Sequence, residues 1–569
     1  MSEKYIKYSF LTRMLLTIAG GKVIREMKRK SRNCKKASDS TLRHILTTSK
    51  DSVYGKEHHF DKILQAKTPE ELAELYHKYV PINEYKELLP YIERHKTGEP
   101  DVLFPGKPFL YATTSGTTKE PKWIPLTAEY HKEVYGKMSL GWFWTLIHNK
   151  PKVFYRPGIS IVGKAIEGKA PDGTLYGSIS GYTFRDIPKF MLKLHTAPGD
   201  VFNIPDYKSR YYAIMRMGIE RDTHIILTAN PSTLVEMQSY ANEYLDEFCE
   251  DIENGTLSAK YPIPDEIRAV LEAKLKPNPG RAAELRKLRE RYGTLLPKHY
   301  WPNLQIVNVW FCGNAKIYYD KVRDSYPSDT VFHEFGYFAT ECRAGLVLKS
   351  NCPDTTLFCH KSHFEFVHES DFDNPDPKIH QVWELEAGRR YKMVVTTCAG
   401  LYRYDMHDLI EVTGHYNEFP QIIYIQKLNG VTSITGEKLH EDQFIEAVHA
   451  AENTTGMKAP FFVGFAEPNK SSYKFYYEFA DQYVSIEEAE KFTTQVDLCL
   501  QDYNPEYKEK RGTDRLKLPE TFILGPKAFE RFKVACINRG YRDGQFKFNL
   551  LMQDEMRHAL FKELIKTSR

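Results

Sequence analysis

The stretch from Phe109 to Pro125 constrains the fold most, because a polar loop separates two apolar segments. The apolar segments are typical of buried strands. A strand that enters a tight loop of hydroxyl residues around one glycine suits a polyphosphate, since glycine lets the backbone approach while hydroxyls, amides and lysine bind the anion. The alternative is an ordinary Ser/Thr-rich turn. The loop reads Thr113-Thr114-Ser115-Gly116-Thr117-Thr118-Lys119-Glu120-Pro121-Lys122.

Composition narrows the class of protein. The 569 residues are 41% hydrophobic and 13% aromatic, which indicates a globular chain of two or more domains. The net charge of +4 does not argue for nucleic acid or an acidic membrane as a partner. The nine cysteines are scattered singly, and the spacing of Cys352 and Cys359 fits no common zinc site. We therefore expect reduced cysteines and a cytoplasmic location. We also expect a monomer.

An apolar segment near the N-terminus, Phe10–Ala19, could be a membrane span, a signal peptide or an amphipathic helix. It is interrupted by Arg13 and is shorter than the roughly 20 apolar residues of a spanning helix. Basic residues follow it where a signal peptide would have a cleavage site. We expect an amphipathic helix packed on the body and no membrane span.

The chain changes character along its length. Residues up to about 100 indicate helices, for example Pro69–Tyr76 after a Thr68 cap. From Phe109 to about Glu411, apolar strands such as Ile306–Phe311 alternate with helices, which predicts an α/β architecture. We expect an N-terminal domain over residues 1–426 with mixed sheets and a helical insertion near 253–300. A smaller α+β domain is expected over 427–569, with hairpin strands at Phe461–Phe465 and Ser472–Phe479 and a helix from Ile486 to Tyr503.

Three further groups of residues are candidates for ligand binding. Tyr337, Thr340 and Glu341 could stack on a base, bind phosphate and hold Mg²⁺, or Thr340 could simply cap a helix. Asp408 precedes an apolar strand and could accept ribose hydroxyls, or it could pair with Arg403.

The third group consists of lysines. Lys427 and Lys438 flank the expected domain junction and could reach phosphate, or both could be solvated surface lysines. Lys547 lies between two aromatic residues in a loop that begins with glycine, and taken alone it would be structural. His407 invites a role as a catalytic base, but a hydrogen-bonded structural histidine is the more common case.

The order of these parts resembles that of adenylate-forming enzymes, and within them the auxin-responsive acyl acid-amido synthetase family. The resemblance covers about residues 60 to 550. The polar loop is similar to the pattern [ST]-[ST]-G-[ST]-[ST]-G-x-P-K, and Leu401–Tyr404 with Asp408 to Leu-Tyr-Arg-Tyr-x-x-Gly-Asp. The other matching segments are Val80–Tyr85, Tyr91–Arg94, Trp301–Leu304, Cys312–Asn314, Gly436–Leu439 and Gln545–Lys547.

The resemblance implies an ATP-dependent ligase. A carboxylic acid would be activated as an acyl-adenylate and transferred to the amine of an amino acid, while the C-terminal domain closes as a lid. It also implies Mg²⁺ at Glu341 and catalytic roles for Lys547 and Lys438. An acyl-CoA ligase and a non-catalytic nucleotide-binding protein remain alternatives. The implied nucleotide-binding residues are Thr114, Ser115, Gly116, Thr117, Thr118, Lys122, Gly313, Asn314, Tyr337, Thr340, Glu341, Asp408 and Lys427.

The sequence departs from the family pattern at four places. Lys119 replaces the second glycine of the loop, and His407 replaces the glycine before the aspartate. Lys427 stands where arginine is usual, and Phe548 follows Lys547 where a small residue or threonine is usual. These departures predict an outlying branch of the family.

Overall fold

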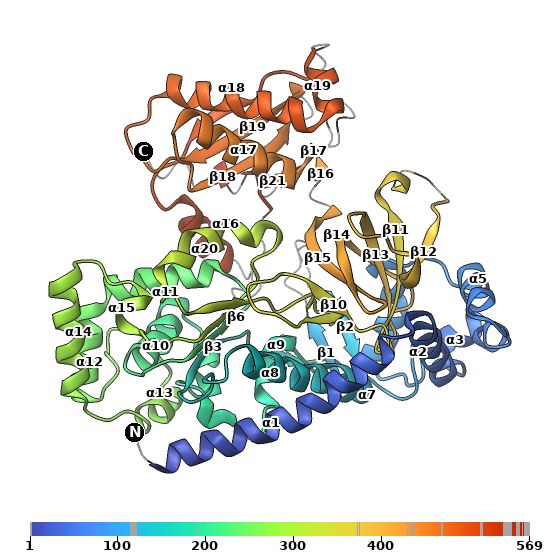
Figure 1. Cartoon of the computed structure of the whole chain (residues 1–569), viewed down its shortest axis with the longest axis horizontal. Coiled ribbons are helices and arrows are strands. Elements are labelled where there is room, and N and C mark those ends of the chain that lie inside the picture. Colours follow the sequence, from blue (N-terminus) through green and yellow to red (C-terminus); the bar gives the residue numbers. More distant parts are fainter. Residues whose placement is uncertain are drawn as a thin grey trace. The chain divides into compact units, whose positions relative to one another are not determined.

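The computed structural model divides into two compact units (Figure 1). Three residues from within the N-terminal stretch group with the C-terminal unit. The N-terminal unit holds Met1–Met406 and Ile410–Tyr424, and the C-terminal unit holds His407–Leu409 and Ile425–Arg569. The structure describes residues 3–113, 122–188, 191–372, 374, 376–428, 431–432, 434, 437, 439–467, 470–512, 516–538, 549–553, 558–559 and 561–562.

The first part of the N-terminal unit is helical, as the sequence predicts. The Thr68 side chain accepts a hydrogen bond from the backbone N–H of Glu71, and Pro69 occupies the first turn of α5. None of the described helices is long and apolar enough to cross a bilayer. The helices are α1 (Glu3–Lys30), α2 (Cys34–Ser49), α3 (Val53–Glu57), α4 (Phe60–Ile63), α5 (Pro69–Tyr79) and α6 (Tyr85–Lys96).

A small sheet follows, in which the two segments flanking the polar loop pair with each other. The strands β1 (Leu110–Thr113) and β2 (Trp123–Leu126) are antiparallel, and Thr113 faces Trp123. The sheet order is β2-β1-β5-β4, with β4 at Gly168–Lys169 and β5 at Leu175–Gly177. The nearby helices are α7 (Ala128–Tyr130), a π-helical turn His131–Gly136, α8 (Lys137–Asn149) and α9 (Ile179–Arg185).

A parallel sheet with the order β3-β6-β7-β8 forms the centre of the α/β part, which confirms the predicted fold class. The sequence predicts a strand over Ile306–Phe311, but β7 ends at Asn308. After β7 the backbone leaves the strand path: the N–H of Trp310 donates to the Ala229 carbonyl and that of Phe311 to the Glu334 carboxylate. The four strands are β3 (Gly158–Ile161), β6 (Ile225–Thr228), β7 (Ile306–Asn308) and β8 (Val331–His333).

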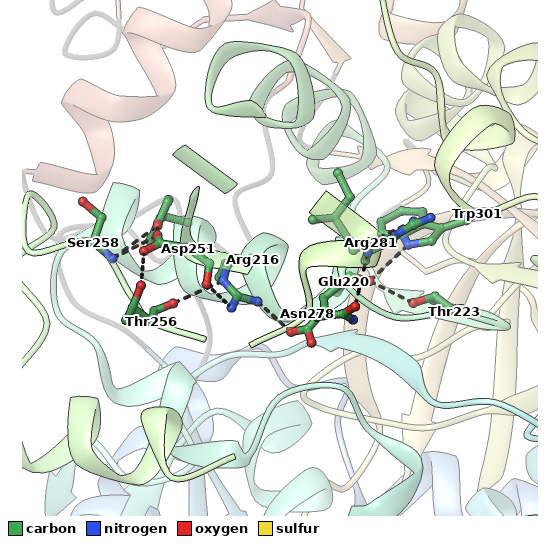
Figure 2. Close-up of polar contacts among 12 residues, drawn as sticks. Arg216, Glu220, Thr223, Asp251, Thr256, Ser258, Asn278, Arg281 and Trp301 are labelled. Carbon is green, nitrogen blue, oxygen red and sulfur yellow. Dashed lines mark hydrogen bonds and ion pairs between the residues drawn. The ribbon is translucent and has the colours of Figure 1, made fainter. Parts of the chain in front are cut away.

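Helices between these strands are joined by a buried polar network around Arg216 (Figure 2). Its guanidinium donates to the Glu220 carboxylate at 2.7 Å and to the carbonyls of Asp251 at 2.7 Å and Thr256 at 3.2 Å. Arg281 donates to the Tyr300 carbonyl at 2.7 Å. The helices are α10 (Tyr207–Ile219), α11 (Ser232–Glu243), α12 (Leu245–Asn254), α13 (Asp265–Glu272), α14 (Pro279–Tyr292), α15 (Pro297–Tyr300) and α16 (Lys316–Val322).

A third sheet of the order β12-β11-β13-β14-β15-β10-β9 leads to the second unit. The sequence places Asp408 before a strand, whereas the structure places it inside the long strand β14. The strands are β9 (Gly345–Val347), β10 (Thr355–Leu357), β11 (His363–His368), β12 (Ile379–Gln381), β13 (Arg390–Thr396), β14 (Tyr404–Tyr416) and β15 (Phe419–Lys427).

The C-terminal unit is a small α+β body. Its main sheet has the order β20-β19-β18-β21, and the predicted hairpin is formed by β18 (Phe461–Glu467) and β19 (Ser472–Glu478). The predicted helix from Ile486 to Tyr503 is α18. The other elements are β16 (Val431–Thr432), β17 (Leu439–His440), α17 (Glu441–Thr455), α19 (Pro505–Gly512), β20 (Glu520–Ile523), α20 (Ala528–Asn538) and β21 (Leu551–Met552).

Candidate active site

Loops at the carboxyl ends of the parallel strands are tied together. The N–H of Trp310 donates to the Ala229 carbonyl at 3.1 Å, and the N–H of Val309 donates to the His333 carbonyl at 3.0 Å. The indole of Trp310 donates to the Gly336 carbonyl at 3.3 Å. Open parallel sheets bind their ligands outside this edge. The loops after β6, β7 and β8 therefore lie together at the edge where such sheets bind ligands.

Glu334, directly after β8, connects these loops through its carboxylate, and the sequence analysis missed it. Its side chain is 2% exposed. Its two oxygens accept the backbone N–H groups of Phe311 at 2.6 Å and Phe335 at 3.0 Å. Burial raises the pKa of Glu334 to about 8, although these donors act to lower it. The sequence signal was an acidic residue immediately after an apolar strand.

The segment with Tyr337, Thr340 and Glu341 is a tight hairpin, so the alternative of a helix capped by Thr340 is wrong. Phe338 and Arg343 form an antiparallel bridge, and the N–H of Ala339 donates to the Cys342 carbonyl at 2.9 Å. The left-handed φ of 78° at Gly336 starts the hairpin. Tyr337 and Thr340 are buried, and Glu341 is half-buried.

The helical segment before α8 contacts the backbone of the hairpin. The Tyr135 hydroxyl contacts the carbonyl oxygens of Ala339 at 3.5 Å and Thr340 at 3.4 Å. The N–H of Tyr337 donates to the Thr355 hydroxyl at 3.1 Å. These bonds fix the backbone of the hairpin and leave Glu341 at its turn.

The predicted Gly313 and Asn314 lie at the start of a 3₁₀ turn, Gly313–Ala315, which leads into α16. Gly313 has a φ of 55°, which favours glycine. The turn follows β7 and so belongs to the same edge of the parallel sheet as Glu334 and Tyr337.

Of the polar loop, Thr114, Ser115, Gly116, Thr117 and Thr118 lie outside the described residues. Its last residue, Lys122, is described. The Lys122 ammonium donates to the Tyr404 hydroxyl at 3.1 Å. It also lies 5.7 Å from the ring centroid of Tyr85 and 5.8 Å from that of Tyr404. Lys122 is thus held between two aromatic rings at the end of β14.

The segment Val80–Tyr85 explains this placement. The N–H of Asn83 donates to the Arg403 carbonyl at 2.8 Å, and the Asn83 carbonyl accepts from Asp405 at 2.8 Å. These bonds form a short parallel bridge between Asn83 and Tyr404. The Tyr85 hydroxyl then accepts the N–H of Trp123 at 2.8 Å. A segment distant in sequence thereby aligns Lys122.

Asp408 forms an ion pair with Lys427, with 2.6 Å between Oδ1 and Nζ. The carboxylate is 5% exposed and the ammonium 32% exposed. The sequence analysis named both residues but did not predict their pairing. The alternative of a solvated Lys427 is therefore wrong.

Arg403 is not the partner of Asp408 among the described contacts. Its guanidinium donates to the buried Glu365 carboxylate at 3.0 Å and to the Val80 carbonyl at 2.8 Å. Burial acts to raise the pKa of Glu365, but Arg403 and His77 hold that pKa well below its ordinary value. The structural ion pair exists, but it involves Glu365.

The two predicted catalytic lysines, Lys438 and Lys547, lie outside the described residues. Glu437, which directly precedes Lys438, is described and fully buried. Its carboxylate accepts the Ile434 N–H at 2.8 Å and the Tyr473 hydroxyl at 2.5 Å. The Asn504 amide donates to its carbonyl at 2.9 Å. Glu437 thus anchors the chain to the C-terminal unit immediately before position 438.

The arrangement of these helices and strands matches that of a known class of protein. The solved structure of the GH3.15 acyl acid amido synthetase superposes with a TM-score of 0.81, at 20% identity, over 95% of this chain and 94% of that one. A second structure, the same synthetase in complex with 2,4-DB, gives a TM-score of 0.81 at 19% identity and covers 96% of both chains. The fold is that of the acyl acid amido synthetases.

The chain belongs to the GH3 family. The GH3 family N-terminal domain matches residues 23–331, the central domain residues 355–427 and the C-terminal domain residues 442–556. This match confirms the family resemblance found in the sequence.

The curated relatives are distant but nearly full-length. Indole-3-acetic acid-amido synthetase GH3.17 of Arabidopsis thaliana is 24% identical over 521 residues, which cover 82% of this chain and 84% of the relative. The 4-substituted benzoates-glutamate ligase GH3.12 of the same plant is 24% identical over 555 residues, which cover 92% and 94%.

Proposed function

We propose that this chain is an ATP-dependent ligase that activates a carboxylic acid as an acyl-adenylate and joins it to the amine of an amino acid. The observation that carries the proposal is membership of the GH3 family over three successive domains. The names of the relatives, which are amido synthetases and an acid–glutamate ligase, support the same reaction class.

The reaction has two steps. A carboxylate oxygen attacks the α-phosphorus of ATP, the bond to the β-phosphate oxygen breaks, and pyrophosphate leaves. The amine nitrogen then attacks the acyl carbon, AMP leaves, and the nitrogen loses a proton. The first step brings two anions together, so it needs positive charge and hydrogen-bond donors fixed around the phosphates.

The described residues support the binding of ATP that this reaction requires. Lys122 is oriented by the rings of Tyr85 and Tyr404 at the end of the polar loop, where an ammonium can bind phosphate. Asp408 presents a carboxylate that can accept ribose hydroxyls, and Lys427 holds it in place. The buried Tyr337 offers an aromatic surface for adenine at the carboxyl edge of the sheet.

Mg²⁺ fits this site through Glu341. The part of the chain that the structure describes has no group of three or more His, Cys, Asp or Glu residues that could hold a metal ion. Mg²⁺ accompanying a nucleotide needs only one or two carboxylates, because phosphate oxygens and waters complete its shell. A half-buried carboxylate at a hairpin turn meets that need, and the ion would offset phosphate charge when bound.

The remaining assignments also belong to this proposal. Lys438 and Lys547 would enter with the C-terminal unit and stabilise charge on the reacting phosphate. The partners would be small-molecule acids and amino acids, and the enzyme would act as a cytoplasmic monomer.

The test is acid-dependent exchange of pyrophosphate into ATP across a library of carboxylic acids. Each supporting acid is then incubated with ATP and, separately, with a panel of amino acids and with coenzyme A, and the products are identified by mass spectrometry. An amide with AMP as co-product is the expected result. Thioester formation alone would make the chain an acyl-CoA ligase, and no exchange with any acid would favour a non-catalytic nucleotide-binding protein.

A further inference from the structure

One face of α1 is apolar and exposed. Phe10, Leu11, Met14, Leu15 and Ile18 are 43–59% exposed. Their spacing of one, three and four residues places them on one side of the helix, over about 12 Å of its length. Exposed apolar residues gathered in this way indicate a binding surface, whereas single ones do not.

The opposite face of α1 is fixed to the N-terminal unit. Leu16, Val23 and Met27 are at most 5% exposed. At Gly20 the helix approaches α8 so closely that a Cβ atom would lie 2.2 Å from the Leu140 carbonyl oxygen. In Figure 1, α1 runs along the outside of this unit beside α8. The apolar face therefore cannot be buried by turning the helix.

The exposed face continues as a basic one. Lys22, Arg25, Lys28 and Arg29 are exposed and follow the apolar residues on the same side of the helix. The only acid in residues 9–30 is Glu26, which lies 3.8 Å from the Lys361 ammonium. The outer face of α1 thus combines an apolar half with a positive half.

A neighbouring loop contacts α1 at Arg13. The Arg13 guanidinium donates to the Pro151 carbonyl and stacks at 4.3 Å over the ring of Tyr155. Tyr155 is 41% exposed, and Lys152 is exposed. Arg13 lies on another side of the helix from Leu11, Leu15 and Ile18, so this loop fixes the helix and does not form part of its apolar face.

We propose that the outer face of α1 binds the surface of an anionic membrane, with the helix axis parallel to the bilayer. The apolar half would enter the boundary between headgroups and acyl chains, and the basic half would contact lipid phosphates. Charge complementarity selects this occupant over a second copy of the chain. Five apolar side chains are few beside the roughly 20–30 residues that each partner of a stable interface contributes, whereas the basic half is complementary to an anionic surface.

The experiment is flotation of the full-length protein with vesicles of phosphatidylcholine alone or of phosphatidylcholine with phosphatidylserine. We expect flotation only with the anionic vesicles, and its loss at high salt. The double variant Phe10→Ser/Leu15→Ser should lower partitioning by about tenfold. Arg25→Glu/Lys28→Glu should lower partitioning by about fivefold for each basic residue replaced.

Matched controls separate this surface from general stickiness. Leu498→Ser removes an apolar side chain that is 50% exposed on α18, and Lys287→Glu reverses an exposed charge on α14. Both should float like the wild type. Equal flotation of the α1 variants, or no binding to anionic vesicles, would overturn the proposal. Self-association in sedimentation velocity that Phe10→Ser/Leu15→Ser abolishes would identify a second copy as the occupant instead.

Discussion

At the scale of single residues, the backbone at His407 has a φ of 50° immediately before Asp408. This left-handed conformation favours glycine, which is the residue that the family pattern has at this position. His407 therefore keeps the backbone path of the motif despite its side chain. The departure from the pattern does not move Asp408 away from Lys427, because the pair closes at 2.6 Å.

Asp408→Ala should weaken ATP binding and abolish adenylation. Each charge-assisted hydrogen bond lost to ribose is worth roughly 1.5–3 kcal/mol. Calorimetric titration with ATP measures the effect. The matched control is Asp405→Ala on the same strand β14. It breaks the 2.8 Å ion pair with Lys392 of β13 and should leave ATP affinity unchanged. Equal affinities of the two folded variants would remove Asp408 from the site.

Glu334→Gln tests the anchor of the carboxyl-edge loops through pH. In the folded protein the pKa of Glu334 is raised from 4.5 to about 8. Between these values the unfolded chain releases a proton that the folded chain keeps, so this group's stabilisation falls as pH rises and is lost once pH passes about 8. The slope is at most about 1.4 kcal/mol per pH unit.

The glutamine variant lacks this titration. Its free energy of unfolding in urea should therefore depend less on pH, and the wild type's advantage should shrink from pH 5.5 to pH 8.5. Parallel stability curves for the two proteins would contradict a neutral Glu334 at acidic pH.

The sequence names individual candidate residues, but their contacts could not be predicted from it. Asp408 and Lys427 were each named from local motifs. Their pairing depends on how β14 and β15 lie together and on the unusual φ at His407, and neither is visible as a pattern. Glu334 was missed for the same reason, since its role comes from backbone donors that only the folded loops bring to it.

At the scale of elements, Arg216 joins α10 to the helical insertion. Arg216→Ala would leave the Glu220 carboxylate and the carbonyls of Asp251 and Thr256 without this donor (Figure 2). Removing one partner of a buried ion pair typically costs about 3–5 kcal/mol. Chemical denaturation followed by circular dichroism measures this loss.

The control for this change is Arg286→Ala on α14. Arg286 pairs with Glu253 at 2.7 Å, but both side chains are more than 40% exposed. Exposed pairs contribute about 0–1 kcal/mol. A similar loss of stability in both variants would mean that burial of Arg216 adds nothing.

Elements with local signals were predicted well. Thr68 and Pro69 fixed the start of α5, and alternating aromatic residues predicted the β18–β19 hairpin. The end of β7 could not be predicted, because Val309–Phe311 are as apolar as the strand itself. Where the strand ends depends on acceptors that only the folded loops provide, such as the Ala229 carbonyl for Trp310 and the Glu334 carboxylate for Phe311.

At the scale of the whole molecule, the proposed function would require the C-terminal unit to bring Lys547 to the reacting phosphate. Lys547→Ala should slow adenylation by about 10²–10³-fold while changing ATP affinity much less. The second half-reaction, started from pre-formed acyl-adenylate, should be affected far less. Lys287→Ala, on the exposed face of α14, serves as the control.

Measuring the two half-reactions separately decides the role of Lys547. Equal losses in both, or no loss in the first, would make Lys547 a structural residue and leave Lys438 as the next candidate.

The pairing of Thr113 with Trp123 has a consequence for how this family can diversify. The sheet fixes both ends of the polar segment, so its length and its anchoring are independent. The entropy of bringing two chain ends together grows only with the logarithm of the number of residues between them, and doubling that number costs about 0.6 kcal/mol. Insertions and deletions between the two strands can therefore be sampled in evolution without unfolding β1 and β2.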